Sequence, residues 1–505
     1  MKYICSILAL AMLGITACTH KSGDVVANDG NFPAPIAAIM ITKCAIAGCH
    51  NQASYGNADS LLLDTWEHLF HGSSSGAEVV AYNAQYSPLL YFVNTDSTLG
   101  PVVAPTMPYS TANRPLPALS KEEYMTLYNW IQNGAPDKYG NIPFASNPET
   151  RQKTYLTQQG CDLLAVIDAQ SHVVMRYIPI GMSNAIESPH CVRISDDGMY
   201  AYVSFLAGQY VQKIDTKTDQ VIGSASLAST VANGSWNIVH VSPGDTELLT
   251  SDWVANGWVV AIDANTMQVQ PQKNWNSSSN GISWPHGIET NATFDTFFVT
   301  SQYSNFIYKL VPDGFGLFKV SLDGNKPSTY TDSNNSNPNP HEILMTPDYS
   351  KYFVTCQGTN KVVVVDAHTD AILATIPVGV FPQELAMSRT KPYMFVTCME
   401  DAASAAYYPH SHGSVYVINY NTFQIVKVLY GDFYQPHGIS VDDQNGTILV
   451  ASTNANPNGP APHHVTSCGG RDGWYTYYDL NTLTPLNNRR YEVTVMPYSS
   501  ATRFK

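Results

Sequence analysis

The strongest constraint on the fold is a repeat that begins at Tyr155 and runs to the end of the chain. Segments 156–181 and 354–379 align over 26 residues without a gap, and both carry Thr-x-Gln-Gly, then an apolar run ending in Asp-Ala, then Ile-Pro-x-Gly. Similar units recur between and after them, with short apolar or alternating stretches bounded by Gly, Asp or Asn, which is typical of β-strands. Four such strands in a unit of about 40 to 50 residues indicate one blade of a β-propeller.

One residue marks the start of the innermost strand of each unit, and we call these the marker residues. Six of them are His190, Asn237, His286, His341, Gln383 and His437. Successive marker residues are 42 to 55 residues apart, and in most units 15 residues separate the marker residue from the end of the second strand. The first unit lacks an innermost strand, which the C-terminal stretch from Pro497 to Phe504 can supply. We therefore expect residues 155–505 to form a seven-bladed propeller closed within one blade, so that no sheet edge stays open.

The innermost strands of a propeller start on one face, so their marker residues should meet at the mouth of the central channel. Imidazoles and thiols gathered there suit copper, zinc or a second haem. The candidate ligands are the marker histidines and the histidines of two long loops, the second of which also carries Cys468: His190, His286, His341, His437, His410, His412, His463 and His464. The alternative is structural, because the turn that starts a blade suits a half-buried polar side chain without any metal.

The propeller resembles the YVTN-type seven-bladed propellers of surface-layer proteins over nearly all of residues 155–505. Its histidines are similar to those of nitrous-oxide reductase, in which a seven-bladed propeller holds a copper cluster on histidines from its blades. The chain departs from that family at Asn237, Gln383 and Tyr498, and it lacks the family's C-terminal copper domain. The aspartates that close apolar strands are predicted to be turn residues, not catalytic ones: Asp168, Asp263, Asp366 and Asp479.

A second constraint is the stretch Cys44-Ala-Ile-Ala-Gly-Cys49-His50. Two cysteines followed directly by a histidine are typical of the attachment site of a c-type haem, in which the thiols form thioethers and the imidazole binds the iron. The usual spacer between the cysteines has two residues, whereas this one has four. A disulfide between the two cysteines, or two free thiols, are the alternatives. Met107, in a proline-rich loop, is the candidate second axial ligand.

A capping box at Ser120 and Glu123 predicts the start of a helix that Gly134 ends. The order of attachment site, methionine loop and closing helix resembles the class I cytochromes c over residues 32–140. This resemblance implies a small all-α domain with one haem c, held by Cys44, Cys49, His50 and Met107. His68 and His71 are alternative iron ligands.

The first 17 residues contain an early lysine and an apolar run, followed by small residues and Cys18. The run is too short for a membrane span and predicts a secretory signal peptide. Its end resembles the lipobox of bacterial lipoproteins. This implies acylation of Cys18, a tether over residues 18–31, and an anchored location in the cell envelope, on the periplasmic side of the outer membrane or on the cell surface. An ordinary signal-peptidase site is the alternative.

The charge of the chain bears on its partners. A net charge of -14 argues against nucleic acid as a partner, since phosphates require a basic surface. The same acidity favours a basic redox partner through electrostatic steering. Outside the export signal and the Cys44–Cys49 motif five cysteines remain, and an odd number in an oxidising compartment leaves at least one thiol free or bound to a metal.

The predicted organisation is multidomain: signal peptide 1–17, tether 18–31, all-α cytochrome c-like domain 32–140, linker 141–154 and all-β propeller 155–505. A haem c domain before a propeller also resembles the haem-containing nitrite reductases, in architecture only, because those propellers have eight blades. Two functional hypotheses follow. The chain is either a membrane-anchored redox protein, in which the haem exchanges electrons with a metal at the propeller mouth, or a binding platform whose haem serves another enzyme.

Overall fold

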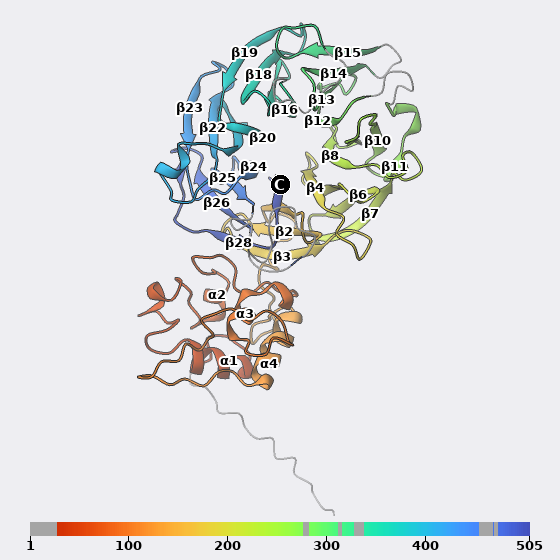
Figure 1. Cartoon of the computed structure of the whole chain (residues 1–505). Coiled ribbons are helices and arrows are strands. Elements are labelled where there is room, and N and C mark those ends of the chain that lie inside the picture. The colour runs from red at the N-terminus through yellow and green to blue at the C-terminus, as the bar shows by residue number, and fades with distance from the viewer. Residues whose placement is uncertain are drawn as a thin grey trace, which may run out of the picture.

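The computed structural model describes residues 28–275, 282–311, 316–327, 338–453, 468 and 473–504. Within these residues all α-helices precede the first strand, which begins at Lys153. Figure 1 shows the strands as a ring of sheets, with the helical segment, residues 28–148, against one side of the ring. None of the described helices has the length and apolar character needed to cross a lipid bilayer. The expected signal peptide and Cys18 lie outside the described residues.

Seven antiparallel sheets make up the ring, each with four strands in one path and one with a fifth strand. The first sheet contains β29 (Pro497–Arg503), β1 (Lys153–Gln158), β2 (Leu163–Asp168) and β3 (Val174–Pro179). The next two contain β4 (Pro189–Ile194), β5 (Tyr200–Phe205), β6 (Tyr210–Asp215) and β7 (Gln220–Ser226), and β8 (Trp236–Val241), β9 (Glu247–Asp252), β10 (Val259–Asp263) and β11 (Gln268–Val269).

The remaining four sheets follow in chain order. Two of them contain β12 (Pro285–Thr290), β13 (Phe297–Ser301), β14 (Phe306–Val311) and β15 (Gly316–Ser321), and β16 (Pro340–Met345), β17 (Lys351–Cys356), β18 (Lys361–Asp366) and β19 (Ile372–Pro377). The last two contain β20 (Val380–Met387), β21 (Tyr393–Glu400), β22 (Ser414–Asn419) and β23 (Ile425–Leu429), and β24 (Pro436–Asp442), β25 (Thr447–Ser452), β26 (Gly473–Asp479), β27 (Thr484–Pro485) and β28 (Tyr491–Val493).

The ring closes through the C-terminal strand. The innermost strands contact one another in the order β29, β4, β8, β12, β16, β20 and β24, and β24 contacts β29 again. Strand β29 pairs antiparallel with β1, so the end of the chain supplies the innermost strand of the first blade. The prediction of a seven-bladed propeller closed within one blade is thereby confirmed, and the closed ring protects the innermost strands from edge-to-edge pairing.

The hairpins between the third and fourth strands are built by aspartate side chains. Oδ1 of Asp263 accepts the backbone N–H groups of Asn265 and Thr266 at 3.0 and 2.8 Å. The carboxylates of three equivalent aspartates accept N–H groups of their own turns in the same way: Asp168, Asp366 and Asp479. These aspartates are turn residues, as predicted, because an Asx side chain supplies the acceptor that a tight turn lacks.

The marker residues are held in place from the neighbouring blade. In five blades a hydroxyl on the second strand donates to the backbone carbonyl of the marker residue in the next blade. The pairs are Ser204 with Asn237, Ser251 with His286, Thr300 with His341, Thr355 with Gln383 and Thr397 with His437, at 2.7 to 2.9 Å. The pairing of first and second strands also shifts at each of these marker residues. Such a β-bulge re-aims a side chain, here at the start of each innermost strand.

The helical segment contains α1 (Ala34–Ile39), which continues as a π-helical turn (Met40–Cys44), then α2 (Trp66–Leu69), α3 (Pro88–Val93) and α4 (Lys121–Gln132). The predicted capping box is present, since Ser120 Oγ accepts the N–H of Glu123 and Glu123 Oε2 accepts the N–H of Ser120. The helices have only 4 to 12 residues, with long irregular stretches between them. The segment is therefore less regularly helical than the expected all-α domain, because prolines interrupt the chain between α3 and α4.

The helical segment packs on the first and last blades of the ring. The ring of Tyr86 lies 5.6 Å from the ring of Tyr177 on β3, edge to face. The N–H of Glu492 on β28 donates to the carbonyl of Ser75 at 2.9 Å. Val80 belongs to a buried cluster that also contains side chains of both blades. These contacts fix the helical segment to the rim of the propeller.

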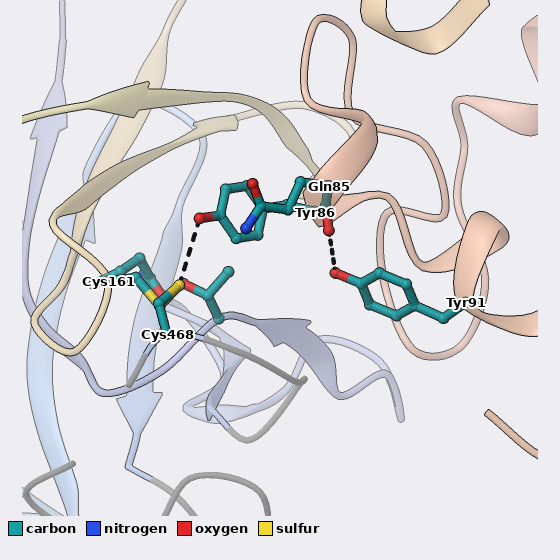
Figure 2. The surroundings of a disulfide bond; sticks show 7 residues. Gln85, Tyr86, Tyr91, Cys161 and Cys468 are labelled. Atoms are coloured by element: carbon teal, nitrogen blue, oxygen red, sulfur yellow. Dashed lines mark hydrogen bonds between the residues drawn. A yellow bond between two sulfur atoms is a disulfide. The ribbon is translucent and has the colours of Figure 1, made fainter. Parts of the chain in front are cut away.

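A disulfide joins Cys161, after β1, to Cys468, which precedes β26 (Figure 2). The hydroxyl of Tyr86 lies 3.4 Å from Sγ of Cys468, so the helical segment touches this bond. The sequence placed Cys468 with loop histidines as a candidate metal-binding thiol. That interpretation is wrong for Cys468, because its sulfur is bonded to Cys161.

Candidate functional site

The helical segment holds a cavity of about 430 Å³. The four residues proposed from the sequence to hold a haem all line it: Cys44, Cys49, His50 and Met107. Apolar side chains from three parts of the segment share the lining: Leu61, Leu63, Leu89, Phe92 and Val93. The volume lies within the range of about 300 to 1,000 Å³ that is usual for small-molecule and cofactor sites. Residues distant in the sequence thus meet around one largely apolar space.

The four-residue spacer between the cysteines folds back as a compact turn. The N–H of Cys49 donates to the carbonyl of Ile46 at 3.0 Å, and the N–H of His50 donates to the carbonyl of Cys44 at 3.1 Å. Both cysteines are free thiols, not a disulfide. Burial raises the pKa of Cys44 to about 12, so its thiol is neutral.

The surroundings of His50 favour its neutral form. Its Nδ1 lies 3.2 Å from the carbonyl oxygen of Leu61, and with the proton on Nδ1 the other ring nitrogen keeps its lone pair. Burial lowers the pKa of His50, which favours the neutral ring. The N–H of Met107 donates to the carbonyl of Phe92 at 2.7 Å, which ties the methionine loop to α3. A neutral imidazole and a thioether are the pair that binds the iron in cytochromes c.

The two alternative histidines lie elsewhere in the helical segment. His68 lies on α2, and its Nδ1 is 2.7 Å from Oδ1 of Asp64 in the loop that leads into this helix. Neither His68 nor His71 is among the described residues that line the cavity. The structure thus brings His50 and Met107 to the cavity and leaves the alternatives outside it.

The marker histidines meet at the centre of the propeller. The ring centroids of His286 and His341 are 3.9 Å apart, those of His190 and His286 are 5.7 Å apart, and those of His341 and His437 are 6.1 Å apart. The ring centroid of Tyr498 on β29 lies 4.5 Å from that of His190 and 3.6 Å from that of His437. We call these five residues the channel cluster. Its four histidines are only 2 to 4% exposed.

The ring nitrogens of the channel cluster differ in their partners. Nδ1 of His190 lies 2.9 Å from the carbonyl oxygen of Asn237, and Nδ1 of His437 lies 3.1 Å from that of Tyr498, each in the next blade. Burial lowers the pKa of His190 and of His341 to about 3. Burial and the neighbouring histidines lower the pKa of His286 as well. These three rings are therefore neutral at pH 7, the form that binds metals.

Buried acidic residues adjoin the cluster, and the sequence interpretation missed them. Glu342 and Glu384 directly follow the marker residues of β16 and β20, and burial raises the pKa of both, that of Glu384 to about 7. Arg193 Nη2 is 3.7 Å from Glu342 Oε1 and opposes both shifts. Burial also raises the pKa of Glu289 to about 8. The tripeptides Pro-His-Glu at 340–342 and Pro-Gln-Glu at 382–384 were the available signal.

The two described loop histidines, His410 and His412, lie apart from the channel cluster. His410 and His412 line a surface cavity of about 720 Å³ together with Tyr408, Trp474 and Arg490. Nδ1 of His412 lies 2.9 Å from Glu400 Oε2, and within the described chain no ring contact joins it to the four marker histidines. His463 and His464 lie outside the described residues.

No protein-family model matches the chain, and no curated protein matches it. Among solved structures, the chain is similar to hydrazine synthase from Kuenenia stuttgartiensis, with 15% identity, a TM-score of 0.46, and coverage of 63% of this chain and 90% of that one. It is also similar to a functionally unknown protein from Desulfotomaculum acetoxidans, with 11% identity, a TM-score of 0.49, and coverage of 68% and 99%. Both similarities are too low to carry an inference about what this chain does.

Proposed function

We propose that the chain is a c-type cytochrome fused to a propeller and that it transfers electrons in the bacterial cell envelope. The observation that supports this most directly is the shared cavity of Cys44, Cys49, His50 and Met107. In the proposal Cys44 and Cys49 hold one haem c covalently, and His50 and Met107 bind its iron. The bound haem supplies one-electron redox chemistry.

The protein groups around the cavity have clear roles in this proposal. The Leu61 carbonyl orients His50 and keeps its ligating nitrogen unprotonated. The apolar side chains exclude water from the cavity, and Arg114 lines it as a cation for the carboxylates of a porphyrin. Lys43 also lines the cavity, but its ammonium is paired with Glu123 at 2.5 Å.

The location and the partner are part of the same proposal. The proposal has three further elements: residues 32–140 form a class I cytochrome c domain, the propeller is of the YVTN type, and a lipid anchors the chain at Cys18. An acylated cysteine holds the protein at a membrane surface, and the net charge of -14 steers a basic redox protein toward it.

The test is expression of the full chain with a haem c maturation system, followed by spectra of the oxidised and reduced protein and denaturing electrophoresis with haem staining. The haem is expected to stay with the denatured polypeptide, and the double variant Cys44→Ser/Cys49→Ser is expected to lose it. Met107→Ala is expected to keep the covalent haem but lower its reduction potential, since a methionine ligand raises the potential. Met182→Ala, which changes an exposed methionine, is the matched control and should leave the potential unchanged.

A colourless wild-type protein, with Cys44 and Cys49 bonded to each other in peptide mass analysis, would show the proposal to be wrong. A covalent haem whose potential is the same in Met107→Ala as in the wild type would remove Met107 from the ligand set. His50→Ala with His68→Ala as its control tests the other ligand in the same way.

A further inference from the structure

The closest pair in the channel cluster forms a compact set of metal-binding groups with a carboxylate. His286 and His341 start the neighbouring strands β12 and β16, and Glu342 follows His341 directly. One ligand atom from each of these three residues can be chosen so that all three atoms lie within 4.8 Å of one another. All three residues are 2 or 3% exposed. The three side chains therefore converge on one point inside the propeller.

Polar atoms of the same three residues have no hydrogen-bond partner in the described chain: Nδ1 of His286, Nδ1 of His341 and Oε2 of Glu342. His286 Nδ1 and Glu342 Oε2 lie 3.9 Å apart, which is too far for a direct hydrogen bond. Backbone groups of His341 and Gln383 act on the rings of His286 and His341 without reaching hydrogen-bond geometry, whereas Nδ1 of His190 lies 2.9 Å from the carbonyl oxygen of Asn237. Leaving buried polar atoms unpaired is costly, so these three atoms point to a bound group that they share.

The charges around the pair also favour a cation. The carboxylates of Glu289 and Glu384 act on that of the buried Glu342, and the half-buried Arg193 is the cation that acts on all three. The side chain of Glu342 is 3% exposed, and its Oε2 has no hydrogen-bond partner in the described chain. An ionised Glu342 would therefore need a cation beside that oxygen, because isolated buried charge is expensive.

The donor set selects the class of metal. Magnesium and calcium prefer oxygen ligands alone, whereas two imidazoles and one carboxylate are a common set for zinc and for non-haem iron. Ligand atoms of a tetrahedral zinc site lie about 3.4 Å apart. The present atoms lie within 4.8 Å of one another, so a bound ion would draw them closer together.

We propose that His286, His341 and Glu342 bind a divalent first-row transition-metal ion at the centre of the propeller. This site is separate from the cavity of the helical segment and does not depend on haem. His190 and His437 flank it as neighbouring rings, and no metal bond is assigned to them.

The site is tested by metal analysis of the purified full-length chain carrying Cys44→Ser and Cys49→Ser, so that haem iron does not contribute. The protein is produced in medium supplied with zinc, iron, manganese and cobalt salts, and its content is measured by inductively coupled plasma mass spectrometry. About one equivalent of one of these metals per chain is expected. Cobalt-loaded protein should also show visible absorption bands from imidazole and carboxylate ligands.

The propeller sequence itself suggests which substitutions the fold tolerates at these positions. Gln383 occupies the marker position of β20, so the fold accommodates glutamine at this place in a blade. His286→Gln/His341→Gln and, separately, Glu342→Gln are expected to lower the metal content at least about tenfold while circular dichroism stays that of a folded propeller. His412→Gln, at an exposed histidine paired with Glu400, is the control and should retain the metal.

The proposal would be overturned if the folded protein that keeps His286, His341 and Glu342 contained less than about a tenth of an equivalent of every supplied metal. Equal metal content or unchanged cobalt bands in the His286→Gln/His341→Gln variant would place the metal elsewhere and overturn it too. Because the wild-type measurement decides the matter alone, a variant that fails to fold does not protect the proposal.

Discussion

Lys153 on β1 and Asp219, in the turn between β6 and β7, form a buried ion pair between neighbouring blades. Nζ of Lys153 lies 2.9 Å from both carboxylate oxygens and 2.8 Å from the carbonyl of Thr216. The hydroxyl of Tyr155 donates to Asp219 Oδ1 at 2.8 Å. The side chains of Lys153 and Asp219 are only 2% and 10% exposed. This pair therefore ties the blade that closes the ring to the next blade.

Removing the acidic partner should be strongly destabilising. Burial lowers the pKa of Lys153, and the Asp219 carboxylate opposes that shift. In Asp219→Asn no carboxylate charge offsets the cost of burying the Lys153 ammonium. Breaking such a pair from one side costs about 3 to 5 kcal/mol of unfolding free energy. Asparagine accepts the positive φ of 56° at position 219, so the substitution adds little backbone strain. Lys153→Met should cost less, about 1 to 3 kcal/mol, because Asp219 keeps the Tyr155 hydroxyl.

The assay is equilibrium urea unfolding followed by tryptophan fluorescence, with the double variant Lys153→Met/Asp219→Asn completing a double-mutant cycle. The double variant is expected to lose less stability than the sum of the single losses. Glu149→Gln removes a pair with Lys217 whose side chains are 61% and 53% exposed, and it should leave the unfolding midpoint unchanged. If Asp219→Asn behaved like Glu149→Gln, the reasoning from burial would be refuted.

Three further predictions concern other parts of the propeller. Burial raises the pKa of Asp252 to about 6, so between about pH 4 and 6 the native state binds more protons than the unfolded chain. The free energy of unfolding should therefore fall as the pH rises through that interval. In Asp252→Asn this loss should be absent, and scanning calorimetry at pH 8 should give a higher melting temperature than for the wild type. Replacing Cys161 and Cys468 together with serine should lower the unfolding free energy by about 2 to 4 kcal/mol, measured by urea titration without reductant. Thr397→Val removes a hydroxyl that donates to the next blade and should cost about 1 to 2 kcal/mol in the same titration, whereas Thr422→Val on the surface should not.

The propeller could be predicted because its determinants are local and repeated. A hairpin turn needs only an acceptor such as Asp366 at the end of an apolar strand, and that pattern is visible wherever it occurs. The role of the C-terminal strand followed from counting, since the first unit lacked an innermost strand. The helical segment is less regular than the expected all-α domain, because prolines and glycines interrupt the chain between its four short α-helices.

Pairing between distant residues was not accessible in the same way. Cys161 and Cys468 are 307 residues apart, and an odd number of cysteines allows several pairings. Only the closure of the ring places the turn after β1 beside the last blade. The sequence therefore indicated that some thiols stay free, and the structure shows three of them, Cys191, Cys356 and Cys398, as buried residues of the blades.

At the centre of the propeller, the sequence could indicate which residues converge but not how their polar atoms are partnered. The marker position does not require an imidazole, since Asn237 and Gln383 occupy it in two blades. Nδ1 of His190 lies 2.9 Å from the carbonyl oxygen of the next marker residue, whereas the backbone of His341 acts on the His286 ring only more weakly and Nδ1 of His286 has no hydrogen bond in the described structure. Glu342 lies beside that unpaired nitrogen only because the neighbouring blade places it there. A local pattern can thus predict a meeting place for side chains, while the packing of adjacent blades decides which of them are left free to bind a metal.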